Sequence, residues 1–594
     1  MALIDPIKTI NQYVGGDDWR IAENANASGI TLSGMANYLN GKMTAEYWLS
    51  EVYSKKQGEL HREGAYHIHD LGSLAPYCVG HDLQDFLMQG LTGVDDRISS
   101  NPPKHFRSAL DQMSNYLSVM ASEWAGASSF SSFDTFMAPF VRKDNLSDEE
   151  IKQGLQSFIY NSNLPNRSGF QSAFINLTFD IKVPDDLKDQ YPIIDDEVMD
   201  FTYGDLQDEV DRINIQFCDV MIAGDRNRRG FTFPIPTYSI INDFEWDSEV
   251  AEKIFTLAQK YGSPYFSLFQ NSDMEPSDVR SMCCRLRLDL NEARSHTNSS
   301  LFGSNVRTGS IGVVTINMAR LGYLHKGNMQ GLLDELDYLL EEAAYTLNKK
   351  REVVSHLMNQ GFYPYSKHYF DSFDSFFNTI GVNGYNEMVA NFSHGNHDLT
   401  SDFGQEMALQ ISDHILKKIV EFQKSSGNLF NFEATPSEGA TYRFAKEDVS
   451  RYPGIITAGE HPNIYYTNSS HIPVGTTSDV FETLDLSDAL QEKFTGGTVV
   501  HIYADSSIKD TASAKNLVKA VTENYKLPFI SLSPTYSICK KDGYVLGDHK
   551  ICPTCGSEDM EVWLRVMGYN RPVSSFNTGK VGEYMDRTYY DVSA

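Results

Sequence analysis

The most specific chemical signal in the chain is a group of cysteines near its C-terminus. Cys552 and Cys555 form a Cys-Pro-Thr-Cys-Gly turn, and Cys539 adds a third thiol thirteen residues upstream. Thiolates at this spacing can reach one ion, and zinc is typically held by four thiolate or imidazole ligands. The sequence therefore predicts a structural zinc site. For its fourth ligand we favour His549 over Asp542, because imidazole suits zinc better than a single carboxylate.

The other cysteines are spread through the chain. Cys78 and Cys218 stand alone, whereas Cys283 and Cys284 are adjacent. Seven cysteines in 594 residues are too few for a disulfide scaffold. Adjacent cysteines are most often buried small hydrophobic residues, so their chemistry has to be argued from the surrounding sequence.

A glycine near the C-terminus, Gly579, is surrounded by several recognisable sequence segments. Gly579 belongs to Phe576-Asn-Thr-Gly-Lys580, which follows Arg565-Val-Met-Gly-Tyr569 and Arg571-Pro-Val573. Asn-Thr-Gly alone is typical of a turn, but the combined segments resemble the glycyl radical segment of anaerobic (class III) ribonucleoside triphosphate reductases. The chemistry fits, because a stable backbone radical needs a flat Cα without a side chain. The resemblance implies that Gly579 carries a radical installed by a separate radical-SAM activating enzyme.

The resemblance extends over almost the whole chain. Ser281-Met-Cys-Cys-Arg285 matches the finger loop of the family, whose essential cysteine falls on Cys284. Further matching segments are His67-Ile-His-Asp70, Tyr77-Cys78, Gly309–Asn317, Thr435–Glu438, Thr467–Ser469 and Thr495–Thr498. The resemblance implies that Cys284 receives the radical and removes the ribose 3′-hydrogen. It also implies that Cys78, on an early strand, supplies a reducing thiol from the opposite face.

Two of these segments suggest contacts with substrate. In Thr435-Pro-Ser-Glu438, Thr435 as N-cap and Glu438 three positions later make a capping box. A helix N-terminus attracts phosphate, so by resemblance Thr435 and Ser437 bind the substrate, with plain capping as the alternative. His67 and His69 alternate along a strand, so they share one face. We expect a hydrogen-bonded pair beside the site, with His67 near the substrate, rather than a metal site.

Ser310, which we also expect among the substrate-binding residues, bears on the source of electrons. Formate-dependent members of the family resemble one another in an asparagine at this position of the Thr308-Gly-Ser-Ile-Gly312 segment. A serine hydroxyl cannot offer the paired donor and acceptor of an amide. The resemblance therefore favours a thioredoxin or glutaredoxin-like reductant, with formate as the alternative. The second redox sulfur remains open between Cys284, Cys283 and another residue.

Helical and strand-like patterns alternate through most of the chain. A helix is predicted over Met329–Arg351, and strands over Ile311–Ile316, Thr498–Tyr503 and Pro528–Leu532. This α/β pattern implies a mainly parallel sheet, open or closed. The resemblance implies a ten-stranded α/β barrel of two five-stranded halves around a central finger loop. We assign residues 1–533 to this barrel, 534–560 to a zinc-binding module, and 561–594 to the glycyl radical loop and tail.

Composition narrows the possible partners and location. With 50 basic and 79 acidic residues, the net charge of −29 disfavours a binder of nucleic-acid polymers or anionic membranes. No apolar run is long enough to span a membrane, and no signal peptide is recognisable. We expect a cytoplasmic enzyme.

The resemblance also has consequences for regulation and for competing functions. The family's core motifs begin near Trp19, so an N-terminal ATP-cone is expected to be missing. A homodimer with ribonucleoside triphosphate substrates and nucleotide effectors is implied. The competing classes are a non-nucleotide glycyl radical lyase or dehydratase, which would lack the zinc knuckle, and a non-enzymatic nucleotide-binding or zinc-dependent interaction protein.

Overall fold

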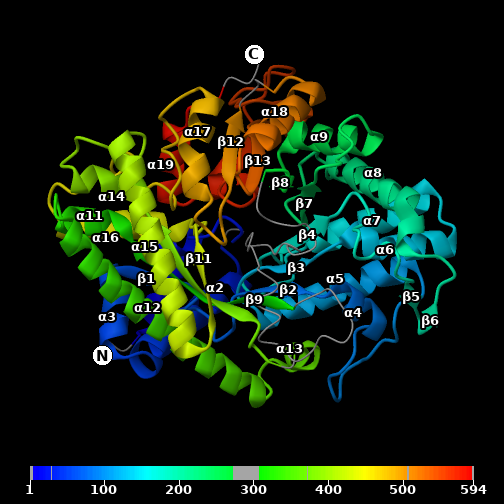
Figure 1. The fold of residues 1–594 in the computed structure, drawn as a ribbon, viewed down its shortest axis with the longest axis horizontal. Helices are drawn as coiled ribbons and strands as arrows, with labels where there is room; N and C mark the ends of the chain where they lie inside the picture. The colour runs from blue at the N-terminus through cyan, green and yellow to red at the C-terminus, as the bar shows by residue number, and fades with distance from the viewer. Residues whose placement is uncertain (1–3, 28–29, 272–306, 371, 505–507, 591–594) are drawn as a thin grey trace.

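The computed structural model describes residues 4–27, 30–271, 307–370, 372–504 and 508–590. Its centre is a mixed sheet with ten strands on one path (Figure 1). Their order is β11 (Leu429–Glu433), β10 (Phe376–Asn383), β9 (Thr308–Asn317), β2 (Cys78–His81), β3 (Ser128–Phe130), β4 (Ile175–Phe179), β7 (Ile235–Ile240), β8 (Tyr265–Leu268), β13 (Phe529–Pro534) and β12 (Val500–Ala504). A short strand, β1 (Tyr66–Ile68), pairs with β9 off this path.

The ten strands form two halves of five that run in opposite directions. β2, β3, β4, β7 and β8 are parallel neighbours, as are β9, β10 and β11, and β12 with β13. The halves meet antiparallel at β2–β9 and β8–β13. A parallel bridge from Glu433 at the end of β11 to Gly496, just before β12, closes the circle. This confirms the predicted ten-stranded barrel. The segment predicted as its central finger loop falls on residues 272–306, outside the described residues.

Helices surround the barrel, and the two large apolar clusters lie between helices and strands. The first half is accompanied by α4 (Leu83–Gln89), α5 (Phe106–Glu123), α6 (Phe133–Asp144), α7 (Asp148–Ser162), α8 (Gln207–Ala223) and α9 (Glu249–Tyr261). The second half is accompanied by α11 (Met318–Leu324), α12 (Met329–Asn359), α13 (Pro364–Tyr369), α14 (Tyr385–Phe392), α15 (Asp402–Ser426), α16 (Gly439–Arg451), α17 (Val480–Gln491) and α18 (Thr511–Asn524). The chain starts with α1 (Pro6–Gly15), α2 (Leu32–Tyr47) and α3 (Lys55–Glu63), and β5 (Ile193–Ile194) pairs with β6 (Glu197–Val198).

The helix predicted from Met329 begins there, and as α12 it continues to Asn359, eight residues past the predicted end. Its apolar stripe, which includes Leu336, Leu340 and Leu347, packs against β9 and β10. Every residue of β9 and β10 is buried, as expected for strands covered on both faces. The predicted strand segments lie within or overlap β9, β12 and β13.

A second, smaller sheet follows the barrel. β14 (Tyr536–Cys539), β15 (Gly543–Leu546), β16 (Met560–Arg565) and β17 (Asn570–Pro572) pair antiparallel in the order β15-β14-β16-β17. The helix α19 (Thr578–Asp586) comes next. The sheet runs past residue 560, so the cysteine-rich turn and the Arg565–Tyr569 segment share one structural unit. That unit packs on the barrel through the rings of Tyr536 and Tyr261, whose centroids are 5.3 Å apart.

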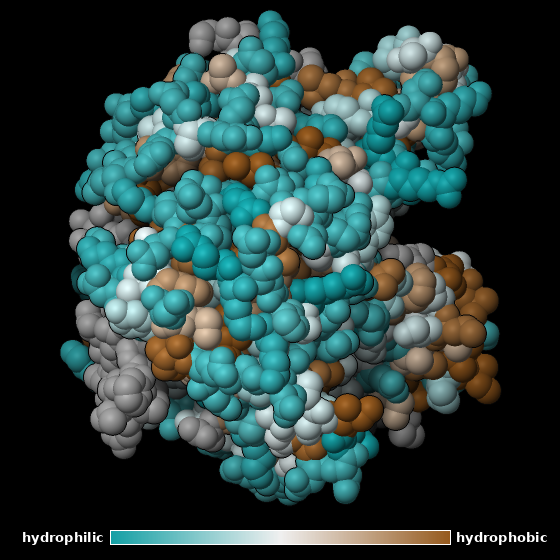
Figure 2. All heavy atoms as spheres, turned by 90° about the vertical axis from the view of Figure 1, so that its right-hand side faces the viewer, coloured by the Kyte–Doolittle hydropathy of each residue, from teal (hydrophilic) through white to brown (hydrophobic). Residues whose placement is uncertain are grey.

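The surface agrees with the acidic composition. The face seen in Figure 2 is mainly hydrophilic, with a group of apolar side chains along one edge beside an indentation. In the ranges that the structure describes, no helix is both long and apolar enough to span a membrane.

Candidate active site and metal centre

Cys78 and Ser310 are direct neighbours on adjacent strands of the barrel. Cys78 opens β2 and pairs with Ser310 on the antiparallel strand β9. Both side chains are buried, and the Cys78 sulfur accepts a hydrogen bond from the Ala127 amide at 3.3 Å. The Ser310 hydroxyl lies 2.7 Å from that of Thr379, which in turn donates to Asn431 at 2.7 Å. A row of polar side chains thus crosses three strands beside the predicted reducing thiol.

The predicted radical-relay residue cannot be placed in this row. Cys284 and its neighbour Cys283 lie within residues 272–306, outside the described part of the chain. This segment connects β8 to β9, and β9 is the strand that carries Ser310.

The substrate segment differs from the predicted capping box. The helix α16 begins at Gly439 with Glu438 as its N-cap residue, and no side chain in the described ranges caps it. Thr435 is instead buried, and its hydroxyl accepts a hydrogen bond from Thr315 at 3.1 Å. The prediction of Thr435 as N-cap is therefore wrong, because Glu438 is committed to other partners. The start of α16 still follows Thr435 and Ser437 directly.

Ser437 retains the features of a ligand-binding residue. Its backbone is fixed by Asn468, which accepts from the Ser437 amide at 3.2 Å and donates to its carbonyl at 2.6 Å. The side chain is 3% exposed, and its hydroxyl has no hydrogen-bond partner among the described residues. Because buried hydroxyls are normally paired, this one is free to bind a ligand at the start of α16.

His67 and His69 lie together as the alternation predicted, with ring centroids 4.5 Å apart in an edge-to-face arrangement. Each ring bonds elsewhere rather than to its neighbour. Arg443 of α16 lies 2.8 Å from Nδ1 of His67, and Nε2 of His69 lies 2.8 Å from the Thr315 hydroxyl. His69 therefore connects through Thr315 to Thr435. Burial lowers the pKa of both imidazoles, so they are neutral near pH 7.

Gly579 is packed too tightly for a side chain. It is the second residue of α19, and a Cβ at this position would lie 2.8 Å from Cβ of Tyr442, on α16. Asn577, two residues before Gly579, caps the helix by accepting from the Lys580 amide. Its side-chain amide donates to the carbonyls of Glu23 and Glu438, both at 3.0 Å. The glycine is thus held beside the helix that follows the substrate segment.

Glu438 joins three distant parts of the chain at this point. Its carboxylate accepts from the Ala25 amide at 2.9 Å and from the Tyr569 hydroxyl at 2.6 Å. The side-chain oxygen of Asn24 also lies 2.6 Å from the Tyr569 hydroxyl, and Arg571 bonds to Asn26. Burial raises the pKa of Glu438, while these hydrogen bonds oppose that shift.

Three buried charges fix α19 itself. Glu583 accepts from Lys580 at 2.5 Å and from Arg587 at 2.8 Å, and all three side chains are almost fully buried. Burial by itself would raise the pKa of Glu583, but the two cations outweigh it and hold the pKa at about 2. The helix that carries Gly579 is therefore anchored by an internal ion cluster.

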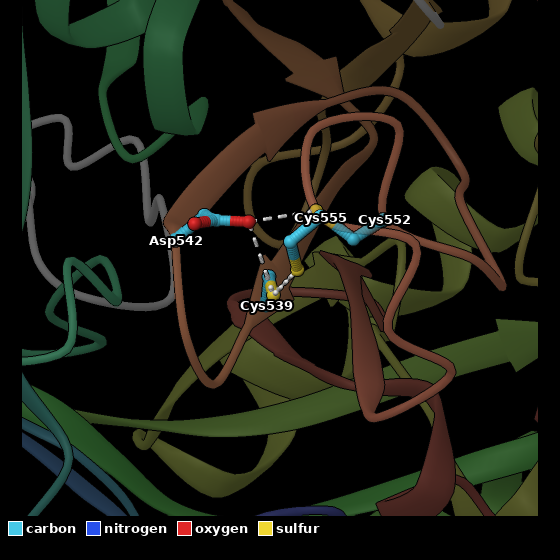
Figure 3. Close-up of side chains that lie close together, drawn as sticks. All are labelled: Cys539, Asp542, Cys552 and Cys555. Atoms are coloured by element: carbon cyan, nitrogen blue, oxygen red, sulfur yellow. Dashed lines mark hydrogen bonds between the residues drawn. The ribbon is translucent and has the colours of Figure 1, made fainter.

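The predicted metal site assembles, with a different fourth member. Cys539, Cys552, Cys555 and Asp542 place one ligand atom each within 4.8 Å of one another. Figure 3 shows the Asp542 carboxylate pointing toward the thiols, and it lies 3.2 Å from the Cys552 sulfur. His549 is turned away, with Nε2 2.8 Å from the Leu546 carbonyl. The geometry corrects our preference for His549 in favour of Asp542, the alternative ligand. Three thiols and a carboxylate suit zinc.

Sequence reasoning missed two residues at this site. Arg443, which contacts His67, sits in an ordinary amphipathic helix and gives no local signal. Lys350 is 3% exposed on α12. It continues the helical spacing of the buried residues Ala343 and Leu347. A charged residue within an apolar stripe could therefore have been noticed in the sequence.

Comparison with known proteins identifies the family. A sequence model of the anaerobic ribonucleoside-triphosphate reductases matches residues 23–590. The chain belongs to this family. The Haemophilus influenzae enzyme of that name is 23% identical over 95% of this chain and 83% of its own length. The enterobacteria phage T4 enzyme is 22% identical, over 89% of this chain and 90% of its own.

Solved structures agree on the fold. The anaerobic ribonucleotide reductase from Thermotoga maritima, in complex with dATP and CTP, superposes with a TM-score of 0.76 at 21% identity, covering 97% of this chain and 98% of its own. Hydroxyproline dehydratase from Clostridioides difficile, a non-nucleotide enzyme, reaches a TM-score of only 0.53 at 11% identity, covering 97% and 88%. The competing lyase or dehydratase is thus a distant neighbour, and the enzyme is an anaerobic ribonucleotide reductase.

Proposed function

We propose that this anaerobic ribonucleotide reductase stores its radical at Gly579 and reduces ribonucleoside triphosphates beside the Thr435–Ser437 segment. The supporting observation is that Gly579 packs against Tyr442, on the helix that begins directly after this segment. In the reaction, one dithiol and one ribonucleoside triphosphate give one disulfide, one water and one 2′-deoxyribonucleoside triphosphate. Cys284 passes the radical to the ribose, and Cys78 supplies one of the two thiols.

The phosphates are assigned to the start of α16. The Ser437 hydroxyl lacks a partner among the residues described, and the first amides of the helix face the same end. Thr435 and His67 position this segment through Thr315 and Arg443. In Ser437→Ala, KM for the nucleotide should rise by about tenfold, as expected for a lost bond to a charged group. Ser450→Ala, an exposed change on α16, is the matched control.

The cysteine site is proposed to hold a structural zinc ion through Cys539, Cys552, Cys555 and Asp542. Its role is to order the turn between β15 and β16, and no catalytic step passes through it. A homodimer, nucleotide effectors and a radical-SAM activating enzyme complete the proposal. A complex with dATP and CTP is known for the Thermotoga maritima relative.

The decisive experiment combines spectroscopy with product analysis. The protein is incubated without oxygen with a radical-SAM activating enzyme, S-adenosylmethionine and reductant. We expect a doublet in the electron paramagnetic resonance spectrum, absent in Gly579→Ala, and formation of deoxyribonucleoside triphosphates. A radical signal without nucleotide reduction would contradict the proposed substrate class while preserving the role of Gly579.

A further inference from the structure

A buried lysine next to the catalytic strands has no described partner. Lys350 is 3% exposed on α12. Among residues 4–590 that the structure describes, no carboxylate lies within ion-pairing distance of its ammonium, and no hydrogen bond to it is found. Neighbouring Lys349, in contrast, is half-exposed and pairs with Glu352 at 2.8 Å. Since buried lysines are rare unless paired, the Lys350 charge requires an explanation.

The strand beside Lys350 makes room for its side chain. A Cβ on Gly312 of β9 would lie 2.7 Å from Cδ, 3.2 Å from Cε and 3.1 Å from Nζ of Lys350. The lysine therefore runs closely along Gly312, two residues from Ser310. Ser310 in turn pairs with Cys78 across the β2–β9 boundary. A side chain on Gly312 would block this path.

The charges that face the Lys350 ammonium belong to only two described groups. Burial lowers the pKa of Lys350, whereas the charges of Asp70 and Cys78 oppose this shift. The same two groups, with Tyr77, act on the guanidinium of Arg167. Asp70 responds to both cations, which counter the raising of its pKa by burial.

Two cations thus share one carboxylate. Another titratable neighbour of Lys350, the imidazole of His69, has its pKa lowered to about 3 by burial and by the charges of Lys350 and Arg443, so it is neutral. Arg443 itself faces the carboxylate of Glu23. The two cations of this described cluster thus face the Asp70 carboxyl group and the Cys78 sulfur.

The surroundings of the Cys78 sulfur suit an anion. It accepts a hydrogen bond from the Ala127 amide at 3.3 Å, and it lies 2.5 Å from where a Cβ on Gly126 would be. Nearby cations and amide donors are the features that stabilise thiolates. We propose that Lys350 is a positioning residue that holds Cys78 as a thiolate in the resting enzyme, with Arg167 balancing Asp70.

This state deepens the proposed function, on which its use in the reaction rests. The thiolate is the form of cysteine that takes part in thiol–disulfide exchange, and a stabilised thiolate is also the better leaving group. Cys78 is thereby prepared for reduction by a dithiol protein after each turnover. The ionisation itself requires neither radical nor substrate, so it can be tested in the enzyme before activation.

The test is a pH titration of thiolate ultraviolet absorbance in the non-activated, zinc-loaded protein. Subtracting the titration of Cys78→Ser isolates Cys78 and cancels the metal-bound thiolates. We expect Cys78 to be ionised at pH 7. The titration of Lys350→Met is corrected in the same way, by subtracting that of the Lys350→Met/Cys78→Ser double variant. The midpoint of Cys78 ionisation should then rise by about one pH unit or more, which lowers the ratio of thiolate to thiol at pH 7 about tenfold. Lys350→Arg should restore the wild-type midpoint.

Control variants separate charge from damage to the fold. Lys349→Met alters the adjacent exposed lysine and should leave the midpoint unchanged. Cys218, whose pKa burial raises to about 12, should remain a thiol throughout. If Lys350→Met does not fold, Gly312→Ala carries the test, because its methyl group displaces the lysine and should raise the midpoint equally. Two outcomes would overturn the proposal. One is a wild-type midpoint of Cys78 ionisation near the ordinary thiol value of about 8.5, and the other is the same midpoint in wild type and Lys350→Met.

Discussion

As the proposed radical site, Gly579 combines a chemical requirement with a steric one. A Cα radical reacts with oxygen and breaks the backbone at that residue, while the contact with Tyr442 leaves no space for a methyl group. We predict that the activated enzyme, when exposed to air, is cut at Gly579 and releases a C-terminal fragment that begins near Lys580. Gly579→Ala should show neither the radical nor the cut. Mass spectrometry of the fragment checks the position.

A second glycine supplies the control. At Gly568, in the neighbouring Arg565–Tyr569 segment, the one described atom that an added Cβ would meet is the Tyr265 hydroxyl oxygen, at 3.9 Å. Gly568→Ala is therefore expected to fold normally and to keep both the radical and the cleavage. An uncut wild-type chain after a confirmed radical signal and exposure to air would rule out Gly579 as the radical site.

Among elements, the four-stranded sheet carries the proposed zinc site. Removing zinc should disorder the turn between β15 and β16 and misplace the segment that leads to Gly579, whereas the barrel keeps its separate core. Metal analysis should find about one zinc ion per chain. Hydrogen exchange should report loss of protection confined to residues 536–572.

The fourth zinc ligand can be decided with two variants. Asp542→Ala removes the carboxylate that points at the thiols and should lower both zinc content and radical yield. His549→Ala should leave both near wild type, since its ring faces the Leu546 carbonyl. The opposite pattern would return the assignment to His549.

The helix α19 depends on its internal ion cluster. Glu583→Gln leaves Lys580 and Arg587 without their buried partner, which should cost about 3–5 kcal/mol and reduce the radical yield. Because the pKa of Glu583 falls to about 2 on folding, its contribution is present above about pH 4.3 and is lost as the pH falls toward 2. The difference in melting temperature between wild type and variant should therefore narrow below about pH 4.3. Asp586→Asn, exposed on α19, is the control, and a difference independent of pH would contradict this account.

Local patterns predicted the elements better than their ends. The spacing of leucines placed the start of α12, and β-branched runs placed β9, β12 and β13. The capping box failed because Glu438 is held by Ala25, 413 residues away, and by Tyr569. His549 was favoured over Asp542 on ligand chemistry alone, but the tight turn after β14 brings Asp542 to the thiols. Such contacts between distant segments leave no periodic trace in the sequence.

For the whole molecule, closure of the barrel was predictable only through resemblance to the family. Alternating strands and helices imply a parallel sheet but not whether it closes. Closure depends on two antiparallel boundaries, β2–β9 and β8–β13, that join segments more than two hundred residues apart. The first boundary brings Cys78, the predicted reducing thiol, next to Ser310.

That pairing leads to a prediction about the external reductant. Ser310 lies opposite Cys78, and its hydroxyl is already engaged with Thr379 and the Gly312 carbonyl. It offers no amide to hold formate, and being a serine it supplies no second thiol to Cys78. We therefore predict slow turnover of the activated enzyme with formate alone and efficient turnover with thioredoxin, its reductase and NADPH. The assay measures deoxyribonucleotide formed per radical in each mixture. Ser310→Asn, assayed in the same mixtures, tests the position directly. If formate alone supports efficient turnover of the wild-type enzyme, the assignment of a dithiol reductant fails, while the roles of Gly579 and Cys284 are unaffected.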